Sequence, residues 1–161
     1  MRLSSHMIRV NRRTDYAIRV ILALSKRGAG VCVSTAEIQR EMLIPPALAQ
    51  RIVADLARGG FIQTFPGRNG GLTLARPPAL INLRQIMEQF EGYFTSPDCL
   101  VSGGECPFNE ECPVRCRWAR LQGLILTELE QTTFEELARE VLSPSDLFQV
   151  VSDQAQVSMK R

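Results

Sequence analysis

Four of the five cysteines in this chain lie close together near the middle of the sequence. Cys99, Cys106, Cys112 and Cys116 are separated by six, five and three residues, in a segment rich in Gly, Pro and acidic residues. The segment lacks the apolar periodicity of a helix or strand. Thiolates in such a segment can bind a metal or cluster, because ligation energy would order a loop that has no core of its own. The cysteines therefore predict a metal-dependent loop.

The intervals between the cysteines bear on which metal they bind. Structural zinc sites usually bring two ligands within about two to four residues of each other, and only the last interval here is that short. Iron–sulfur clusters are larger, accept wider intervals and are held by soft thiolates. We therefore expect an iron–sulfur cluster, either 2Fe-2S or 4Fe-4S. Zinc is the first alternative, and unligated thiols, inert or redox-active, are the second.

The rest of the sequence argues against disulfides and against thiol-based catalysis. No basic and apolar signal peptide opens the chain, and no apolar run approaches the length of a bilayer span. We expect a cytoplasmic protein without a membrane partner, in which cysteines stay reduced. A redox enzyme would need a thiolate beside a base or in a CxxC pair, but no CxxC occurs and the only histidine, His6, lies in the N-terminal tail. We therefore do not expect an enzyme.

Charge is divided unevenly along the chain. Residues 1–80 carry 12 Lys/Arg against 4 Asp/Glu, a net charge of +8, whereas residues 81–161 carry 7 against 13, a net charge of −6. A basic half of this kind suggests contact with a polyanion, and the acidic half a different role.

Two helices are predicted at the start of the basic half. The first begins at Asn11, has a broad apolar face and is stopped by Gly28. A capping box formed by Ser34 and Glu37 opens a short second helix through Met42.

A third helix and a hairpin follow. Pro46 suits the first turn of this helix, which ends at Gly59-Gly60 and has a polar exposed face. Two short helices joined by a tight turn indicate a helix-turn-helix. Residues 61–65 and 72–75 are strand-like, and the turn between them, residues 66–71, makes this hairpin a wing.

The winged helix predicts how the basic half binds DNA. The third helix is expected in the major groove, while Arg68 and Asn69 at the hairpin tip reach the backbone or the minor groove. Winged helices also serve as protein-interaction modules, but the charge of +8 favours DNA. The expected DNA-binding residues are Arg9, Arg12, Thr35, Pro46, Gln50, Arg51, Arg58, Arg68 and Asn69.

The acidic half contains a long apolar stripe. A helix that begins at Asn82 and ends at Glu91-Gly92 leads into the cysteine loop, residues 92–113. In the helix after the loop, apolar residues recur every three or four positions. These residues are Val114, Trp118, Leu121, Ile125 and Leu129. Since one small domain offers this stripe little to pack against, we expect a homodimer interface, as two-fold DNA reading requires. Docking within one chain is the alternative.

The predicted fold class is mainly α with a small β-hairpin. Residues 8–80 form a winged helix-turn-helix DNA-binding domain, and residues 143–161 form a C-terminal tail. Residues 81–142 contain the linking helix, the cysteine loop and the long dimerisation helix. A last helix, capped at Thr132-Thr133, runs through Leu142.

Several segments together resemble the Rrf-two superfamily of winged-helix transcriptional regulators, which includes IscR, NsrR and RirA. They are RTDYAIRVILAL at 13–24, GGFIQTFPGRNGGLTLARPP at 59–78, NLRQIMEQFEG at 82–92, and the cysteine loop followed by CRWARL. The resemblance implies a cytoplasmic homodimer whose DNA affinity is controlled by an iron–sulfur cluster that senses iron, redox state or nitric oxide. It also implies three cluster ligands, Cys99, Cys106 and Cys112. The alternative is a zinc-stabilised winged-helix DNA-binding protein without a sensing role.

The resemblance leaves the fourth cluster ligand open. The position of a histidine ligand in the cluster-assembly branch is held here by Arg115, which cannot ligate. Asp15 matches the aspartate that serves from the partner subunit in the nitric-oxide-sensing branch, and Cys116 is the alternative. The chain departs from the family in two places. The first cysteine interval is one residue longer than is common, and Pro66-Gly67 replaces the usual Arg-Gly of the wing.

Overall fold

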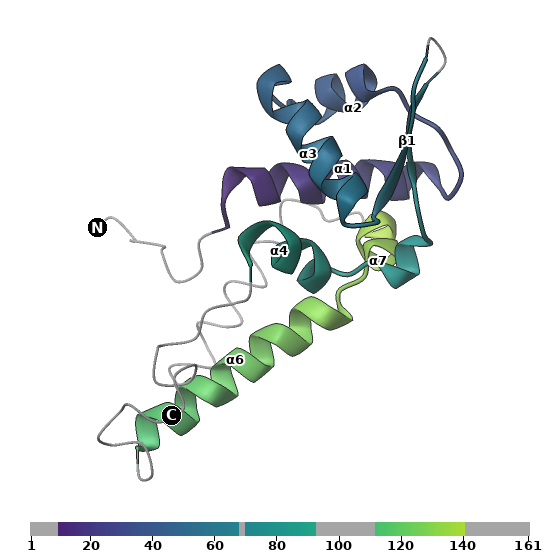
Figure 1. Cartoon of the computed structure of the whole chain (residues 1–161). Coiled ribbons are helices and arrows are strands. Elements are labelled where there is room, and N and C mark those ends of the chain that lie inside the picture. Colours follow the sequence, from purple (N-terminus) through teal and green to yellow (C-terminus); the bar gives the residue numbers. More distant parts are fainter. Residues whose placement is uncertain (1–9, 68–69, 93–111, 141–161) are drawn as a thin grey trace, which may run out of the picture.

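The computed structural model describes residues 10–67, 70–92 and 112–140. These residues are mostly helical, with one two-stranded antiparallel hairpin (Figure 1). The helices and strands are α1 (Arg12–Arg27), α2 (Thr35–Glu41), α3 (Pro46–Arg58), β1 (Ile62–Phe65), β2 (Gly71–Leu74), the 3-10 turn η1 (Pro78–Leu80), α4 (Leu83–Glu91), α6 (Pro113–Gln131) and α7 (Phe134–Arg139). The predicted fold class is confirmed.

Helix α1 lies at the centre of the winged-helix domain. The side chain of Asn11 caps it by accepting a hydrogen bond from the backbone N–H of Thr14 at 2.9 Å, and Gly28 ends it, as predicted. Its buried face contains Ala17, Val20, Ile21, Ala23 and Leu24. Helices α3, α4 and α7 and strand β2 all pack on α1, so α1 connects the helix-turn-helix and the hairpin to α4 and α7.

The expected capping box of α2 is only half formed. Ser34 does cap the helix, because its hydroxyl accepts a hydrogen bond from the backbone N–H of Glu37 at 3.2 Å. The carboxylate of Glu37 lies 3.2 Å from the guanidinium of Arg27 on α1 and does not complete the box. Arg27 also pairs with Glu41, and this hydrogen bond is the main reason that the pKa of Arg27 is raised. An ion-pair group thus joins α2 to α1.

The turn between α2 and α3 has an unusual backbone. Leu43 adopts the left-handed conformation, with φ of 53°, and its side chain is 79% exposed. Ile44 next to it is buried in the core. Pro46 occupies the first turn of α3, as predicted, and Ile52 and Leu56 are completely buried. The turn therefore directs α3 across the core while leaving its opposite face exposed.

The hairpin is held by the segment that precedes α2. Strands β1 and β2 pair in the register Ile62 with Leu74 and Phe65 with Gly71. Val33 adds a bridge at the outer side of β2, where its backbone exchanges hydrogen bonds of 2.9 and 2.7 Å with Leu72. Gly71 is required there, since a Cβ atom would lie 2.4 Å from the carbonyl oxygen of Val33.

Helix α7 returns to the winged-helix domain and completes its core. Phe134 is fully buried, and its backbone N–H donates to the carbonyl of Ile81 at 2.9 Å. Thr133 caps the helix in a capping box with Glu136. The helix ends at Arg139 because Glu140 takes an extended conformation, so the prediction that it runs through Leu142 was wrong.

Helix α6 extends away from the winged-helix domain (Figure 1). None of its residues is buried, although its C-terminal end is joined to α4 by an ion pair between Glu130 and Arg84 at 2.9 Å. Val114, Trp118 and Leu124 are among the exposed large apolar residues. No helix in the described parts of the chain is long and apolar enough to span a membrane.

Candidate nucleic-acid interface and cysteine ligands

The face of α3 that points away from the core carries several predicted DNA contacts. Gln50, Arg51 and Arg58 are exposed, on the side of the helix opposite to Ile52 and Leu56. Such an arrangement fixes the helix by its apolar face and leaves amide and guanidinium groups free to approach base edges.

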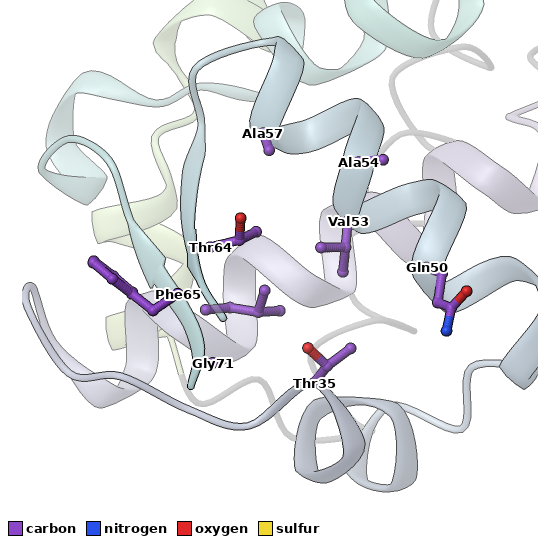
Figure 2. Close-up of a pocket in the computed structure, with 9 residues that line it drawn as sticks. Thr35, Gln50, Val53, Ala54, Ala57, Thr64, Phe65 and Gly71 are labelled. Atoms are coloured by element: carbon purple, nitrogen blue, oxygen red, sulfur yellow. The ribbon is translucent and has the colours of Figure 1, made fainter. Parts of the chain in front are cut away.

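A groove of about 400 Å³ separates α3 from the hairpin (Figure 2). Residues from four elements, α2, α3, β1 and β2, line it. They are Thr35 at the start of α2, Gln50, Val53, Ala54 and Ala57 on α3, and Thr64, Phe65, Gly71 and Leu72 on the strands. Hydroxyl and amide groups thus lie beside an apolar surface that includes Phe65, whose side chain is 49% exposed. A groove with this lining can donate hydrogen bonds to phosphate oxygens and pack against deoxyribose.

Of the remaining predicted DNA contacts, Thr35, Pro46 and Arg12 lie among the described residues. Thr35 is half-buried in its wall, and Pro46 is exposed at the first turn of α3. Arg12 is exposed at the start of α1. The other predicted contacts, Arg9, Arg68 and Asn69, lie outside the described residues.

An ion-pair network anchors α3 from behind. Asp55 lies 2.6 Å from Arg13 on α1 and also pairs with Arg58, one turn along α3. The side chain of Asp55 is only 13% exposed, whereas that of Arg58 is 75% exposed. Gln89 on α4 donates to the backbone carbonyl of Asp55 at 3.5 Å. Arg58 is therefore held in place by a carboxylate, which also neutralises part of its charge.

A second polar cluster lies at the start of α1. One carboxylate oxygen of Glu91, Oε1, accepts a hydrogen bond from the Thr14 hydroxyl at 2.6 Å and one from the Asn11 backbone N–H at 2.8 Å. Burial alone would raise the pKa of Glu91, but these hydrogen bonds outweigh it and lower the pKa below its ordinary value. The carboxylate thus ties the last turn of α4 to the first turn of α1.

Three of the predicted cluster ligands lie among the described residues. Cys112 is half-buried immediately before α6, and Cys116 is exposed one turn later. Asp15 forms an ion pair with Arg19 at 2.7 Å on the exposed side of α1. Cys99 and Cys106 lie outside the described residues. Within the parts of the chain that the structure describes, no three His, Cys, Asp or Glu residues come together as a metal site.

Cys112 and Asp15 belong to well-separated ends of the molecule. Cys112 precedes the end of α6 that points away from the winged-helix domain, whereas Asp15 lies in α1 within that domain (Figure 1). A single chain in this conformation does not bring them together. The donors do match an iron–sulfur cluster in kind, because Cys112 and Cys116 are free thiols.

The family follows from a comparison with known proteins. Residues 10–140 match the family Rrf2, described as an iron-dependent transcriptional regulator. The chain belongs to the Rrf2 family. The resemblance inferred from the sequence is confirmed, and this Rrf2 protein is a transcriptional regulator and not an enzyme.

Individual Rrf2 proteins resemble the chain over most of its length. The HTH-type transcriptional regulator NsrR of Bacillus licheniformis is 26% identical over 127 residues, which cover 77% of this chain and 87% of the relative. CymR (YrzC), the global cysteine regulator of B. subtilis, has a TM-score of 0.70 at 24% identity and covers 82% of this chain and 97% of that chain. T. potens IscR has a TM-score of 0.64 at 18% identity and covers 85% of this chain and 95% of that chain. The two structures establish the fold.

Sequence reasoning missed part of the candidate interface of this Rrf2 protein. Val53, Ala57, Thr64 and Phe65 line the groove but were not among the expected DNA contacts. A signal for the helical ones was present, since Gln50, Val53 and Ala57 are spaced by three and four residues and so share one face. The strand residues have no such signal, because a hairpin can pack either face on a helix.

Proposed function

We propose that this Rrf2 protein is a cytoplasmic homodimer whose affinity for specific DNA is controlled by an iron–sulfur cluster. The observation that carries the proposal is the position of Cys112. It is a free thiol at the junction between the cysteine segment and α6, whose apolar residues are largely uncovered. A cluster on this segment would therefore lie at the N-terminal end of the proposed dimer helix, on the stretch of sequence that joins α4 to α6.

DNA binding is assigned to α3, the groove and the hairpin. Gln50 and Arg51 would read base edges in the major groove, where each good pair of contacts contributes on the order of 1–3 kcal/mol of discrimination. The DNA backbone that borders the major groove would lie in the protein groove between α3 and the hairpin. There, Thr35 and Thr64 would donate to phosphates and Phe65 would pack against deoxyribose. Arg68 and Asn69 would contact the backbone or the minor groove.

Cluster binding is assigned to Cys99, Cys106 and Cys112. Asp15 of the partner subunit is the favoured fourth ligand, and Cys116 is the alternative. The separation of Asp15 from Cys112 within one chain supports a ligand from the partner over one from the same chain. A cluster bound there would supply a redox-active iron centre. To ligate, the Asp15 carboxylate would have to leave Arg19, a surface ion pair that contributes at most about 1 kcal/mol.

The function is tested by purifying the protein without oxygen and measuring its visible absorption, iron and zinc content, and DNA affinity. Mössbauer spectroscopy then distinguishes a 2Fe-2S from a 4Fe-4S cluster. We expect a brown protein whose affinity for a selected operator differs between the cluster-bound and cluster-free forms. A colourless protein with stoichiometric zinc would support the zinc-stabilised alternative, and equal affinity of the two forms would overturn the sensing role. Asp15→Ala and Cys116→Ala, reconstituted separately, identify the fourth ligand from their spectra.

A further inference from the structure

The last turn of α4 contacts the DNA-binding elements through three consecutive residues. Gln89 donates to the backbone of Asp55 on α3, and the ring of Phe90 lies 6.0 Å from the guanidinium of Arg13 on α1. Glu91 accepts the two hydrogen bonds from the start of α1. Residue 93, two positions after Glu91, begins the segment that contains Cys99 and Cys106. The final turn of α4 thus connects the cysteine segment directly to α1 and α3.

Of these contacts, the one made by Glu91 is the strongest. Thr14 is fully buried, so its hydroxyl needs a partner, and a carboxylate acceptor makes a charge-assisted bond of 2.6 Å. The second bond satisfies the backbone N–H of Asn11, the residue that caps α1. The negative charge also lies at the positive end of the α1 dipole. Asn11 Oδ1 also lies 3.2 Å from the Thr14 hydroxyl, but this neutral oxygen already accepts the Thr14 backbone N–H at 2.9 Å, so the carboxylate of Glu91 is the nearer and stronger acceptor for the hydroxyl.

Helix α4 ends immediately after Glu91. Gly92 ends α4 with φ of 80°, a left-handed conformation, and its N–H donates to the carbonyl of Glu88 at 3.1 Å. The other end of α4 is fixed to α6 through Arg84 and Glu130. A displacement of the chain beyond Gly92 therefore acts first on the last turn of α4 and, through Glu91, on the first turn of α1.

We propose that Glu91 is a positioning residue through which the state of the cysteine segment sets the position of the N-terminal end of α1. This end carries Arg12, an expected DNA contact, and Asp15, the candidate ligand. The inference rests on the proposed function, because it requires a cluster whose binding changes DNA affinity. The inference adds that the contact of Glu91 with Thr14 and Asn11 transmits a conformational change from the cysteine segment to the DNA-binding domain.

The test compares DNA affinity in the cluster-bound and cluster-free forms of several variants. Glu91→Ala removes both hydrogen bonds, and Thr14→Val removes one of them while keeping the buried volume. Glu88→Gln is the matched control, since Glu88 lies one turn earlier on α4 and bonds to Arg84 of the same helix. In wild type the ratio of the two affinities is expected to be on the order of 5–100. In Glu91→Ala the two affinities should differ by no more than about twofold. Thr14→Val should lower the affinity ratio, and Glu88→Gln should leave the ratio unchanged.

Amide hydrogen exchange provides a readout that a purely structural role would not change. In wild type, exchange of the first-turn amides of α1 should differ between the two forms, and in Glu91→Ala this difference should vanish. A folded Glu91→Ala protein that keeps the wild-type affinity ratio overturns the inference and leaves the proposed function intact. A wild-type ratio of one overturns the proposed function, and the inference with it. If Glu91→Ala does not fold, Thr14→Val decides by the same criteria.

Discussion

Arg13 on α1 and Asp55 on α3 form an ion pair with an N–O distance of 2.6 Å, and the same carboxylate pairs with Arg58 on the exposed side of α3. Two arginines, one from each helix, thus share one poorly exposed carboxylate. This arrangement fixes the rotation of α3 relative to α1, and it also places a negative charge close to the surface that is proposed to face DNA.

Replacing Asp55 should therefore have opposite effects on stability and on DNA binding. Asp55→Asn keeps the shape but loses both ion pairs, and we expect a loss of roughly 1–2 kcal/mol of unfolding free energy. Because Arg58 is then free to neutralise a phosphate, the slope of log affinity against log salt should steepen by about 1. Denaturant titration and a salt series measure the two effects. Glu135→Gln on α7, which removes an exposed pair with Arg139, is the control and should leave the slope unchanged.

Substitutions on α3 should alter base preference, whereas substitutions in the groove should alter binding to the DNA backbone. Gln50→Ala with Arg51→Ala should change which bases are preferred, at about 1–3 kcal/mol per lost base contact. Phe65→Ala should instead weaken binding to all sequences alike, because deoxyribose is common to every nucleotide. Selection from random duplexes, followed by competition with unrelated DNA, measures both effects. Specific binding that survives the double change on α3 would contradict the assigned orientation.

Local signals in the sequence predicted the helix ends well. Asn11, Gly28, Pro46 and Asn82 act on residues within one turn, so the residue types alone define the ends. The wing followed similarly from a Pro- and Gly-containing turn between two strand-like runs.

Contacts between distant residues were not predictable in the same way. The Glu37 side chain pairs with Arg27 of another helix, although its position in the sequence suits a capping box. Glu91 and Thr14 are 77 positions apart, and neither periodicity nor spacing links them. The sequence places Phe134 only at the start of a short terminal helix, whereas in the structure its side chain is fully buried in the core beside α1. The groove and the Glu91 contact depend on such tertiary packing, so sequence reasoning located α3 and the cysteines but not these features.

Leu43 offers a direct test of backbone strain in the helix-turn-helix. Its left-handed conformation costs a residue with a Cβ atom about 1–2 kcal/mol, and its exposed side chain gains little from packing. Leu43→Gly should remove this strain while making the unfolded chain more flexible, for a net stabilisation of about 0.5–1 kcal/mol. Leu43→Ala, which keeps the Cβ atom, should not produce this gain. Equal stability of Leu43→Gly and Leu43→Ala in denaturant titrations would contradict the explanation.

The contribution of Glu91 to stability should depend on pH in a defined direction. Its pKa in the folded protein lies below the ordinary value of 4.5, so the ionised form is favoured by folding. The stability it contributes is therefore complete above that ordinary value and is lost as the pH falls through the lowered pKa. The difference in unfolding free energy between wild type and Glu91→Gln should narrow with acidification, and in a Thr14→Val background it should be smaller at every pH. If the difference in unfolding free energy between wild type and Glu91→Gln does not vary with pH, the stabilising role of the ionised Glu91 carboxylate is refuted.

The apolar residues of α6 provide the test of the proposed dimer. Leu121 and Leu124 are 39% and 61% exposed in the single chain, so charging them disturbs few contacts within that chain. Leu121→Glu with Leu124→Glu would bury unpaired charge in an interface between two copies and should give monomers in sedimentation experiments. Affinity for a two-half-site operator should fall by roughly 100-fold or more, since the second half-site is no longer linked, whereas affinity for a single half-site should not change. Ala119→Glu, at an exposed position on the side of α6 opposite to Leu121 and Leu124, should remain dimeric. An intact dimer in the double variant would place the interface elsewhere, because an interface centred on these positions would have to bury four unpaired carboxylates, two from each copy.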